Sequence, residues 1–287
     1  KRAKRSGGGR AVLFAMDLLD ELRTQKEAAQ ELDVAFAADQ FTVYYQPIYC
    51  ARRRTINSLE ALVRWEHPSR GIRSAGEFMD HIYRLGLSSK LDQLVLSRVL
   101  ADIESAETKG APMPRVAINV SAASMMDSDY LERVSACSLP SVGLSLEISE
   151  SVDFERHMEH MTKRVAEFAA KGLDFEIDDF GTGHASIYCF KKLRPSRIKI
   201  ARELVLDVET AQDTRQMIQT ICTLAKSFGA SIVAEGVENE DMAATLSLLG
   251  CDYLQGFGLS RPKNFDQTLK QLKAPEASNT IDVEAAA

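Results

Sequence analysis

Polar side chains that could bind a metal ion stand at or near the ends of several short aliphatic runs in this sequence. The clearest run is Phe175–Gly183, where alternating apolar residues end in Asp178 and Asp179 before a turn bracketed by glycines. Other runs carry Glu60, Asn119, Glu147, Lys199, Glu235 and Gln255. If these runs end at one place, the five carboxylates among them would raise one another's pKa unless cations offset their charge.

Oxygen ligands without cysteine or histidine indicate hard ions such as Mg²⁺ or Mn²⁺ rather than zinc. Two such ions ~3.5–4 Å apart, bridged by a carboxylate, assist the in-line attack of water on a phosphodiester. Asp178 is the natural bridge because Asp179 follows it directly. Lys199 could hold or deprotonate the attacking water, and the planar guanidinium of Arg64 could clamp a substrate phosphate.

The aliphatic runs have the length and composition of β-strands, and helical patterns separate most of them. This alternation predicts parallel strands with outer helices, and eight strands predict a closed barrel. The expected strands are 42–48, 56–65, 115–120, 143–148, 173–178, 197–200, 231–235 and 252–255. The expected helices include 77–85, 90–105, 156–171, 211–228 and 240–249.

The connection between the first two expected strands is the exception to this pattern. It consists only of Tyr49–Thr55, whereas a parallel crossover needs a dozen residues or more. We therefore expect an α/β fold, a modified TIM (β/α)8 barrel with one antiparallel strand. In such barrels the carboxyl ends of the strands form the active face.

The sequence divides into four expected parts. Residues 1–14 are basic and glycine-rich, and the apolar spacing in residues 15–39 predicts a connector helix. Residues 40–273 form the expected barrel domain. Residues 274–287, with Pro275, Ser278, Asn279 and a run of alanines, have the composition of a disordered tail.

Composition narrows the class of protein further. A net charge of -6 argues against a general nucleic-acid surface, so we expect neither DNA nor RNA as a partner. The five cysteines are scattered and form no Cys-x-x-Cys pair, which indicates a reducing, cytoplasmic location and no structural zinc. No apolar run approaches the ~20 residues of a membrane span, although a longer parent protein could be tethered to a membrane.

The segment Glu60-Ala61-Leu62-Val63-Arg64-Trp65-Glu66-His67-Pro68 resembles the signature of the EAL domain family of cyclic-di-GMP phosphodiesterases. The similarity continues, in order, over about residues 40–265. It includes Tyr45–Ile48, Asn119–Ser121, Glu147–Glu150, Asp178–Gly183, Lys199-Ile200, Ala234–Glu238 and Gln255–Phe257.

This resemblance implies hydrolysis of cyclic-di-GMP to linear pGpG with two Mg²⁺ or Mn²⁺ ions. The implied metal ligands are Glu60, Asn119, Glu147, Asp178, Asp179 and Glu235. Catalysis would rest on Lys199, Glu235 and Glu60, and the implied substrate contacts are Gln46, Arg64, Asp179 and Gln255. Glu150 would anchor the loop after strand five, and the family typically forms homodimers through that loop and the following helix.

The first residues, Ala3–Phe14, resemble the end of a GGDEF domain, the diguanylate cyclase domain. The resemblance implies a composite parent protein in which a fused GGDEF domain precedes the EAL domain. No cyclase activity is expected of the chain itself.

Three departures from the family pattern bear on activity. Ala201 stands where the family usually has Asp after Lys199-Ile200, and Ala75 and Ile82-Tyr83 also differ. The missing carboxylate leaves two hypotheses open, an active phosphodiesterase and a catalytically weak or inactive receptor for the nucleotide. A third, unrelated hypothesis takes Lys199 as the Schiff-base lysine of an aldolase-type barrel, but it leaves the other carboxylates unexplained.

Overall fold

The computed structural model describes residues 23, 25–136, 143–149, 154–182 and 187–274. The chain divides into two compact units. The barrel unit holds Val43–Leu62 and the residues from Ser89 onward, and the N-terminal unit holds the residues up to Thr42 together with Val63–Ser88.

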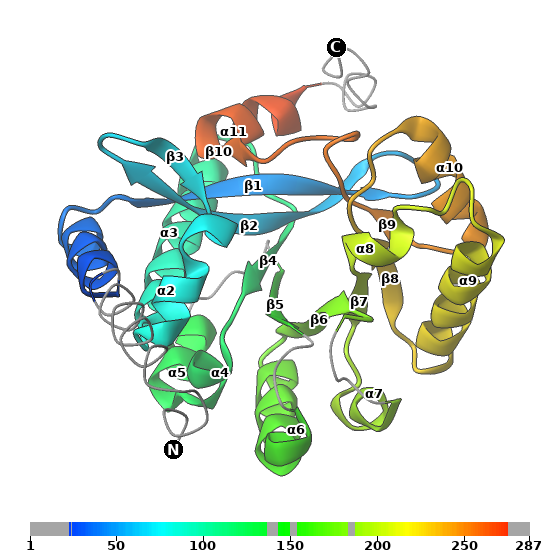
Figure 1. Ribbon diagram of the computed structural model, residues 1–287, viewed down its shortest axis with the longest axis horizontal. Coiled ribbons are helices and arrows are strands. Elements are labelled where there is room, and N and C mark those ends of the chain that lie inside the picture. Colours follow the sequence, from blue (N-terminus) through cyan, green and yellow to red (C-terminus); the bar gives the residue numbers. More distant parts are fainter. Residues whose placement is uncertain (1–22, 24, 137–142, 150–153, 183–186, 275–287) are drawn as a thin grey trace, which may run out of the picture. The chain divides into compact units, whose positions relative to one another are not determined.

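A closed barrel of eight strands forms the centre of the barrel unit (Figure 1). In chain order they are β1 (Phe41–Cys50), β2 (Ile56–His67), β4 (Arg115–Asn119), β5 (Leu144–Ser149), β6 (Asp174–Phe180), β7 (Arg197–Ile200), β8 (Ser231–Ala234) and β9 (Tyr253–Leu254). Neighbours from β2 to β9 pair in parallel. The eight strands therefore match the predicted runs to within a few residues.

Strand β1 is the antiparallel member, as predicted. It pairs antiparallel with β9 through Tyr49 opposite Leu254, and it also pairs with β2, which closes the barrel. The turn between β1 and β2 is held by the amide of Cys50, which donates to the carbonyl oxygen of Thr55. Such a short turn can join only antiparallel neighbours.

The sequence patterns missed two short strands. β3 (Gly71–Ser74) pairs antiparallel with the end of β2 in the N-terminal unit, and β10 (Lys263–Asn264) pairs antiparallel with β1 in the barrel unit. With four and two residues respectively, neither is long enough to show an alternating pattern.

Helices follow most of the strands of the barrel unit, and the long ones agree with the predicted segments. The described helices there are α3 (Ser88–Thr108), α4 (Ala122–Met126), α5 (Ser128–Ala136), α6 (Phe154–Ala170), α7 (Ile187–Leu193), α8 (Arg202–Val205), α9 (Gln212–Ser227), α10 (Glu240–Leu249) and α11 (Phe265–Lys273). Capping residues in the sequence determine where several of these helices begin and end. Asn239 caps α10 by accepting from the amide of Met242, and Gly250 ends it at a left-handed φ of 104°.

The barrel strands present polar residues on one face and apolar residues on the other. In β5, for example, Ser145 and Glu147 alternate with Leu144, Leu146 and Ile148, and all five are buried. Since the outer face of a barrel strand packs under helices, the apolar residues form the core there and the polar residues face the interior. The strands therefore aim acidic and basic side chains at one another.

The N-terminal unit contains a helix over residues 25–37, the end of β2, β3, the 3-10 helix η2 (Ala75–Glu77) and α2 (Met79–Arg84). Its core is aromatic, with ring centroids of Phe41, Trp65 and Phe78 5.6–5.8 Å apart. The helix lies in the segment for which a connector is expected. The expected GGDEF remnant (1–14) and residues 275–287 of the expected tail lie outside the described residues. Within the described part of the chain, no helix combines the length and apolar content needed to cross a membrane.

Candidate active site

A buried lysine lies at the centre of the site. Lys199 comes from β7, and its ammonium group reaches carboxylates from four other positions around the barrel. Its Nζ lies 2.6 Å from Glu235 Oε1, 3.0 Å from Glu60 Oε2, and 3.2 Å from both Glu147 Oε2 and Asp178 Oδ1. The predicted strand ends therefore do meet at one place.

Parallel register explains this meeting. Glu147 on β5 lies opposite Asn119 at the end of β4, and Asp178 on β6 lies opposite Ser149 at the end of β5. Glu235 follows the last residue of β8, and its amide donates to the carbonyl oxygen of Ile200 on β7. These side chains consequently share the carboxyl end of the barrel, as expected for an active face of this fold.

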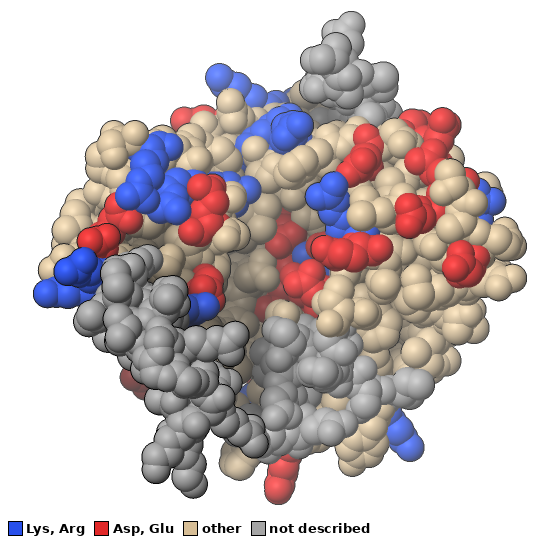
Figure 2. Space-filling view, in the orientation of Figure 1, with Lys and Arg blue, Asp and Glu red and all other residues tan. Residues whose placement is uncertain are grey.

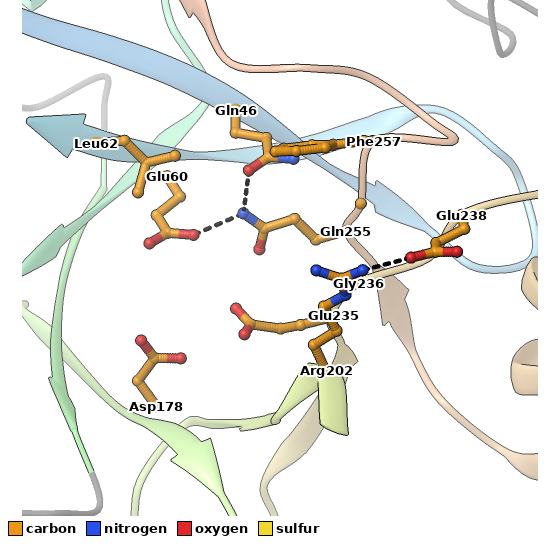
Figure 3. Close-up of a pocket in the computed structure, with 11 residues that line it drawn as sticks. Gln46, Glu60, Leu62, Asp178, Arg202, Glu235, Gly236, Glu238, Gln255 and Phe257 are labelled. Carbon is orange, nitrogen blue, oxygen red and sulfur yellow. Dashed lines mark hydrogen bonds and ion pairs between the residues drawn. The ribbon is translucent and has the colours of Figure 1, made fainter. Parts of the chain in front are cut away.

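Side-chain amides hold Glu60 in place. Gln255 Nε2 donates to Glu60 Oε2 at 2.6 Å and to Gln46 Oε1 at 3.2 Å (Figure 3). Asn119 Nδ2 donates to Glu60 Oε1 at 2.9 Å. Gln46 in turn donates to the carbonyl oxygen of Ser260 at 3.0 Å. Because both oxygens of Glu60 accept hydrogen bonds, the orientation of this carboxylate is fixed from two sides.

Asp178 and Asp179 could not both face the site from a regular strand, since successive strand side chains point to opposite faces. The backbone of Asp179 has a left-handed φ of 55°, and the pairing of β6 with β7 shifts register between Ile177 and Phe180. This irregularity turns the second carboxylate toward the first. Asp179 thereby joins a group with Asp178 and Glu235.

Two groups of carboxylates could each hold a metal ion. One comprises Glu60, Glu147 and Asp178, the other Asp178, Asp179 and Glu235, and in each the oxygens lie within 4.8 Å of one another. Asp178 belongs to both groups, as the sequence suggested for a bridging ligand. Within the described part of the chain, the buried atom Glu147 Oε1 has no hydrogen-bond partner, and Asp178 Oδ1 has no hydrogen bond beyond its ion pair with Lys199 Nζ. An all-oxygen group with such an unpartnered atom fits a hard divalent ion.

Several buried carboxylates share one lysine, and the pKa values of these groups are shifted in different directions. Burial lowers the pKa of Lys199, but the surrounding carboxylates raise it well above its ordinary value. Burial raises the pKa of Glu147 well above normal, and it raises that of Glu235 to about 8. For Glu60, burial is outweighed by the charge of Lys199 and the hydrogen bonds from the neighbouring amides, so its pKa is lowered. The site thus holds more negative groups than one ammonium can neutralise.

Divalent-ion binding is therefore expected to depend on pH. With its pKa of about 8, Glu235 carries a proton at neutral pH in the metal-free protein and must lose it to become a ligand. Apparent affinity should rise as the pH increases through about 8, and binding near neutral pH should release protons. Calorimetric titration with Mn²⁺ in buffers of different ionisation enthalpy measures this release. An affinity that does not change with pH across that range would contradict the prediction.

A cavity of about 290 Å³ opens onto these groups. Acidic side chains gather at its floor, in the hollow at the centre of the view in Figure 2. Its lining includes the apolar side chains of Leu62 and Phe257 as well as Arg202 and Glu238. Arg202 Nη2 donates to Glu238 Oε1 at 2.6 Å, and both side chains are more than half exposed.

The sequence patterns predicted no role for Arg202, Glu238 or Phe257. Glu238 and Phe257 do end two of the motifs quoted for the family resemblance, and Arg202 directly follows Ala201. Of the predicted site residues, Arg64 lies in the N-terminal unit, where its Nη1 donates to the carbonyl oxygen of Val63. Glu150 lies outside the described residues.

The fold and the site define an α/β barrel with an acidic centre that could bind metal ions at the carboxyl ends of its strands. The chain belongs to the EAL domain family, whose model matches residues 29–262.

Relatives and a solved structure agree with this membership. The chain is 29% identical over 265 residues to the cyclic di-GMP phosphodiesterase NbdA of Pseudomonas aeruginosa, covering 91% of this chain and 34% of NbdA. It is 30% identical over 271 residues to the bifunctional diguanylate cyclase/cyclic di-GMP phosphodiesterase MucR of the same organism, covering 93% of this chain and 39% of MucR. The chain thus spans little more than a third of the length of these relatives.

A solved structure of the PaMucR phosphodiesterase in complex with c-di-GMP has a TM-score of 0.77 to this chain. Its sequence is 30% identical, and the match covers 84% of this chain and 99% of that chain. The barrel of this chain therefore has the same fold as the PaMucR phosphodiesterase.

Proposed function

We propose that this EAL domain is a metal-dependent phosphodiesterase that hydrolyses cyclic-di-GMP to linear pGpG. The observation that carries the proposal is the pair of carboxylate groups joined by Asp178 beside the buried ammonium of Lys199. The activities named for NbdA, MucR and the PaMucR structure support the choice of substrate.

The proposed ligands are the carboxylates of the two groups, with the amide oxygen of Asn119 as a further donor beside Glu60. We propose Mg²⁺ or Mn²⁺ as the ions, since all the donors are oxygen atoms. When bound, two such ions would polarise the phosphodiester and lower the pKa of a bound water. Gln255 and Gln46, which line the same cavity, would bind the substrate.

Lys199 is proposed to hold the attacking water rather than to take its proton. Its raised pKa keeps the ammonium charged, so it can donate hydrogen bonds but cannot act as a base. Glu235, whose Oε1 lies 2.6 Å from Lys199 Nζ, is proposed to act with Lys199 in orienting that water. Asp179 is proposed both as a ligand and as a substrate contact, and Arg64 as a phosphate contact.

The proposal is tested by incubating the purified chain with cyclic-di-GMP and Mg²⁺ or Mn²⁺ and separating the products by chromatography. We expect pGpG to appear, and EDTA to prevent its formation. Replacing Mg²⁺ with Ca²⁺ should preserve nucleotide binding but stop hydrolysis, because the looser coordination of Ca²⁺ misplaces the water. Intact nucleotide under all these conditions would overturn the proposal.

A second candidate function, a receptor that binds cyclic-di-GMP without hydrolysing it, is favoured by one observation. Ala201 occupies the N-cap position of α8 with no side-chain hydrogen bond, and it is fully buried beside the site. Tight binding of a nucleotide that stays intact would support this candidate. A Schiff-base role for Lys199 is not favoured, because such a lysine needs a lowered pKa whereas that of Lys199 is raised.

Ala201→Asp is expected to raise the turnover number several-fold. The side chain of an aspartate at this N-cap position could accept from an amide in the first turn of α8, which is worth about 1 kcal/mol, and would fix the chain that follows Lys199. Steady-state assays with saturating Mn²⁺ measure the effect. Ala201→Asn distinguishes the effect of capping α8 from the effect of the added charge, since asparagine caps a helix as well as aspartate does but is neutral. Equal turnover in all three proteins would show that the position does not limit activity.

Other features remain part of the proposal. We infer a fused GGDEF domain in the parent protein, which the bifunctional name of MucR and the partial coverage of the relatives support. We also propose a homodimer formed through α7 and the loop before it, where Tyr188 exposes 56% of its surface. A cytoplasmic location is proposed from the scattered cysteines.

A further inference from the structure

We propose that Cys222 and Cys251 form a thiol-oxidation site that hydroperoxides convert into an intramolecular disulfide. Cys222 lies in the third turn of α9, and Cys251 directly follows the glycine that ends α10. The two sulfur atoms are 3.9 Å apart, and both residues are buried. This site lies outside the carboxylate cluster and does not depend on the proposed function.

The surrounding backbone brings the two thiols close enough to react. A disulfide needs its sulfur atoms ~2.05 Å apart, so they must approach by about 2 Å. Gly250 packs against α9 so closely that a β-carbon there would lie 3.7 Å from Cβ of Cys222 and 3.2 Å from Nζ of Lys226. The left-handed φ of Gly250 places Cys251 against the helix.

The charges around the pair give its two thiols different reactivity. The hydrogen bond with Cys251 lowers the pKa of Cys222 against the effect of burial, and the nearby charge of Lys226 lowers it further. The same hydrogen bond and burial raise the pKa of Cys251. We take Cys222 as the nucleophile of the pair because Lys226, one turn further along α9, favours its thiolate, the form that attacks an oxidant.

The chemistry proceeds in two steps with hydrogen peroxide as the oxidant. The Cys222 thiolate attacks one peroxide oxygen, the O–O bond breaks, and the departing hydroxide takes up a proton to leave as water. The resulting sulfenic acid is attacked by the sulfur of Cys251, which loses its proton and displaces a second water. In sum, two thiols and one peroxide give one disulfide and two waters.

The position of Cys251 connects this site to the barrel. The next residue, Asp252, exchanges backbone hydrogen bonds with Ala51 and Ile232, and β9 follows at once. Gln255, whose side-chain amide donates a hydrogen bond to Glu60, comes directly after β9. A movement of Cys251 toward Cys222 would therefore act on the segment leading to Gln255.

The test is peptide mapping of the folded chain by mass spectrometry without reduction. The protein is treated with hydrogen peroxide, and remaining thiols are blocked with iodoacetamide. We expect a linked peptide pair containing Cys222 and Cys251, lighter by two hydrogens and cleaved by dithiothreitol. Cys50→Ser should leave its yield unchanged, because Cys50 lies in β1 and outside the pair.

Two variants test the assigned order. In Cys251→Ser the sulfenic acid should persist at residue 222 and react with dimedone, whereas Cys222→Ser should give little dimedone adduct at residue 251. Dimedone labelling of Cys251 in preference to Cys222 would overturn the order. The proposal itself fails if peroxide modifies Cys50 while no linked pair forms, or if the pair forms only in denaturant.

Discussion

Glu60→Ala is expected to lower the rate of cyclic-di-GMP hydrolysis about 1000-fold, as is typical when one group that stabilises transition-state charge is removed. Glu60 belongs to one of the two carboxylate groups, and its oxygens accept from Asn119, Gln255 and Lys199. Without Glu60, an ion held by that group would lose a ligand, and each of the three donors would lose one of its acceptors. Steady-state kinetics with Mn²⁺ measure the loss.

Glu66→Ala is the matched control for this prediction. Glu66 lies on the same strand, but its side chain is exposed near the end of β2 in the N-terminal unit. We expect this variant to keep full activity. Circular dichroism and denaturant unfolding must show that Glu60→Ala is folded. A folded Glu60→Ala protein with undiminished hydrolysis would remove Glu60 from the mechanism.

Lys199→Met is expected to destabilise the metal-free protein by about 3–5 kcal/mol, the usual cost of removing one partner from a buried ion pair. The ammonium group of Lys199 lies within 3.2 Å of oxygens from four buried or partly buried carboxylates, and without it these groups would either repel one another or take up protons. Divalent ions should restore much of the loss, because they supply the missing positive charge. Unfolding by urea, with EDTA and then with Mg²⁺, measures both effects.

The exposed Lys171, which follows α6, supplies the comparison for this second experiment. Lys171→Met removes the same charge from a surface site and should change stability by no more than about 0.5 kcal/mol. If the Lys199→Met protein folds only when Mg²⁺ is present, the return of the folded signal on adding Mg²⁺ also shows that the ion replaces the missing positive charge. Equal stability of the Lys199 variant and the parent in EDTA would show that the carboxylates do not need the lysine.

Much of the barrel could be predicted because its strands are buried on both faces and are separated by long amphipathic helices. The strand ends then fix where Glu147, Asp178 and Lys199 must meet, since parallel strands bring their carboxyl ends to one side. The antiparallel direction of β1 could also be predicted, because a short turn restricts the direction of the strand that follows it. These inferences use only local spacing and general rules of topology.

Other features depend on contacts that spacing does not encode. The strands β3 and β10 exist because longer strands offer them hydrogen-bonding edges, and α8 has only four residues. The hydrogen bond between Gln46 and Gln255 joins residues 209 positions apart, and the pair formed by Arg202 and Glu238 joins the segments after β7 and β8. Long-range side-chain pairs of this kind become visible only once the barrel is closed.

Asp179 meets two demands at once, and this restricts how the position can change during evolution. Its left-handed backbone, with a φ of 55°, is accessible mainly to glycine, asparagine and aspartate. Its place beside Asp178 and Glu235 calls for a carboxylate. Glutamate would keep the charge but strain the backbone, and asparagine would keep the backbone but lose the charge. No single substitution satisfies both demands, so we expect no substitution at residue 179 to be neutral.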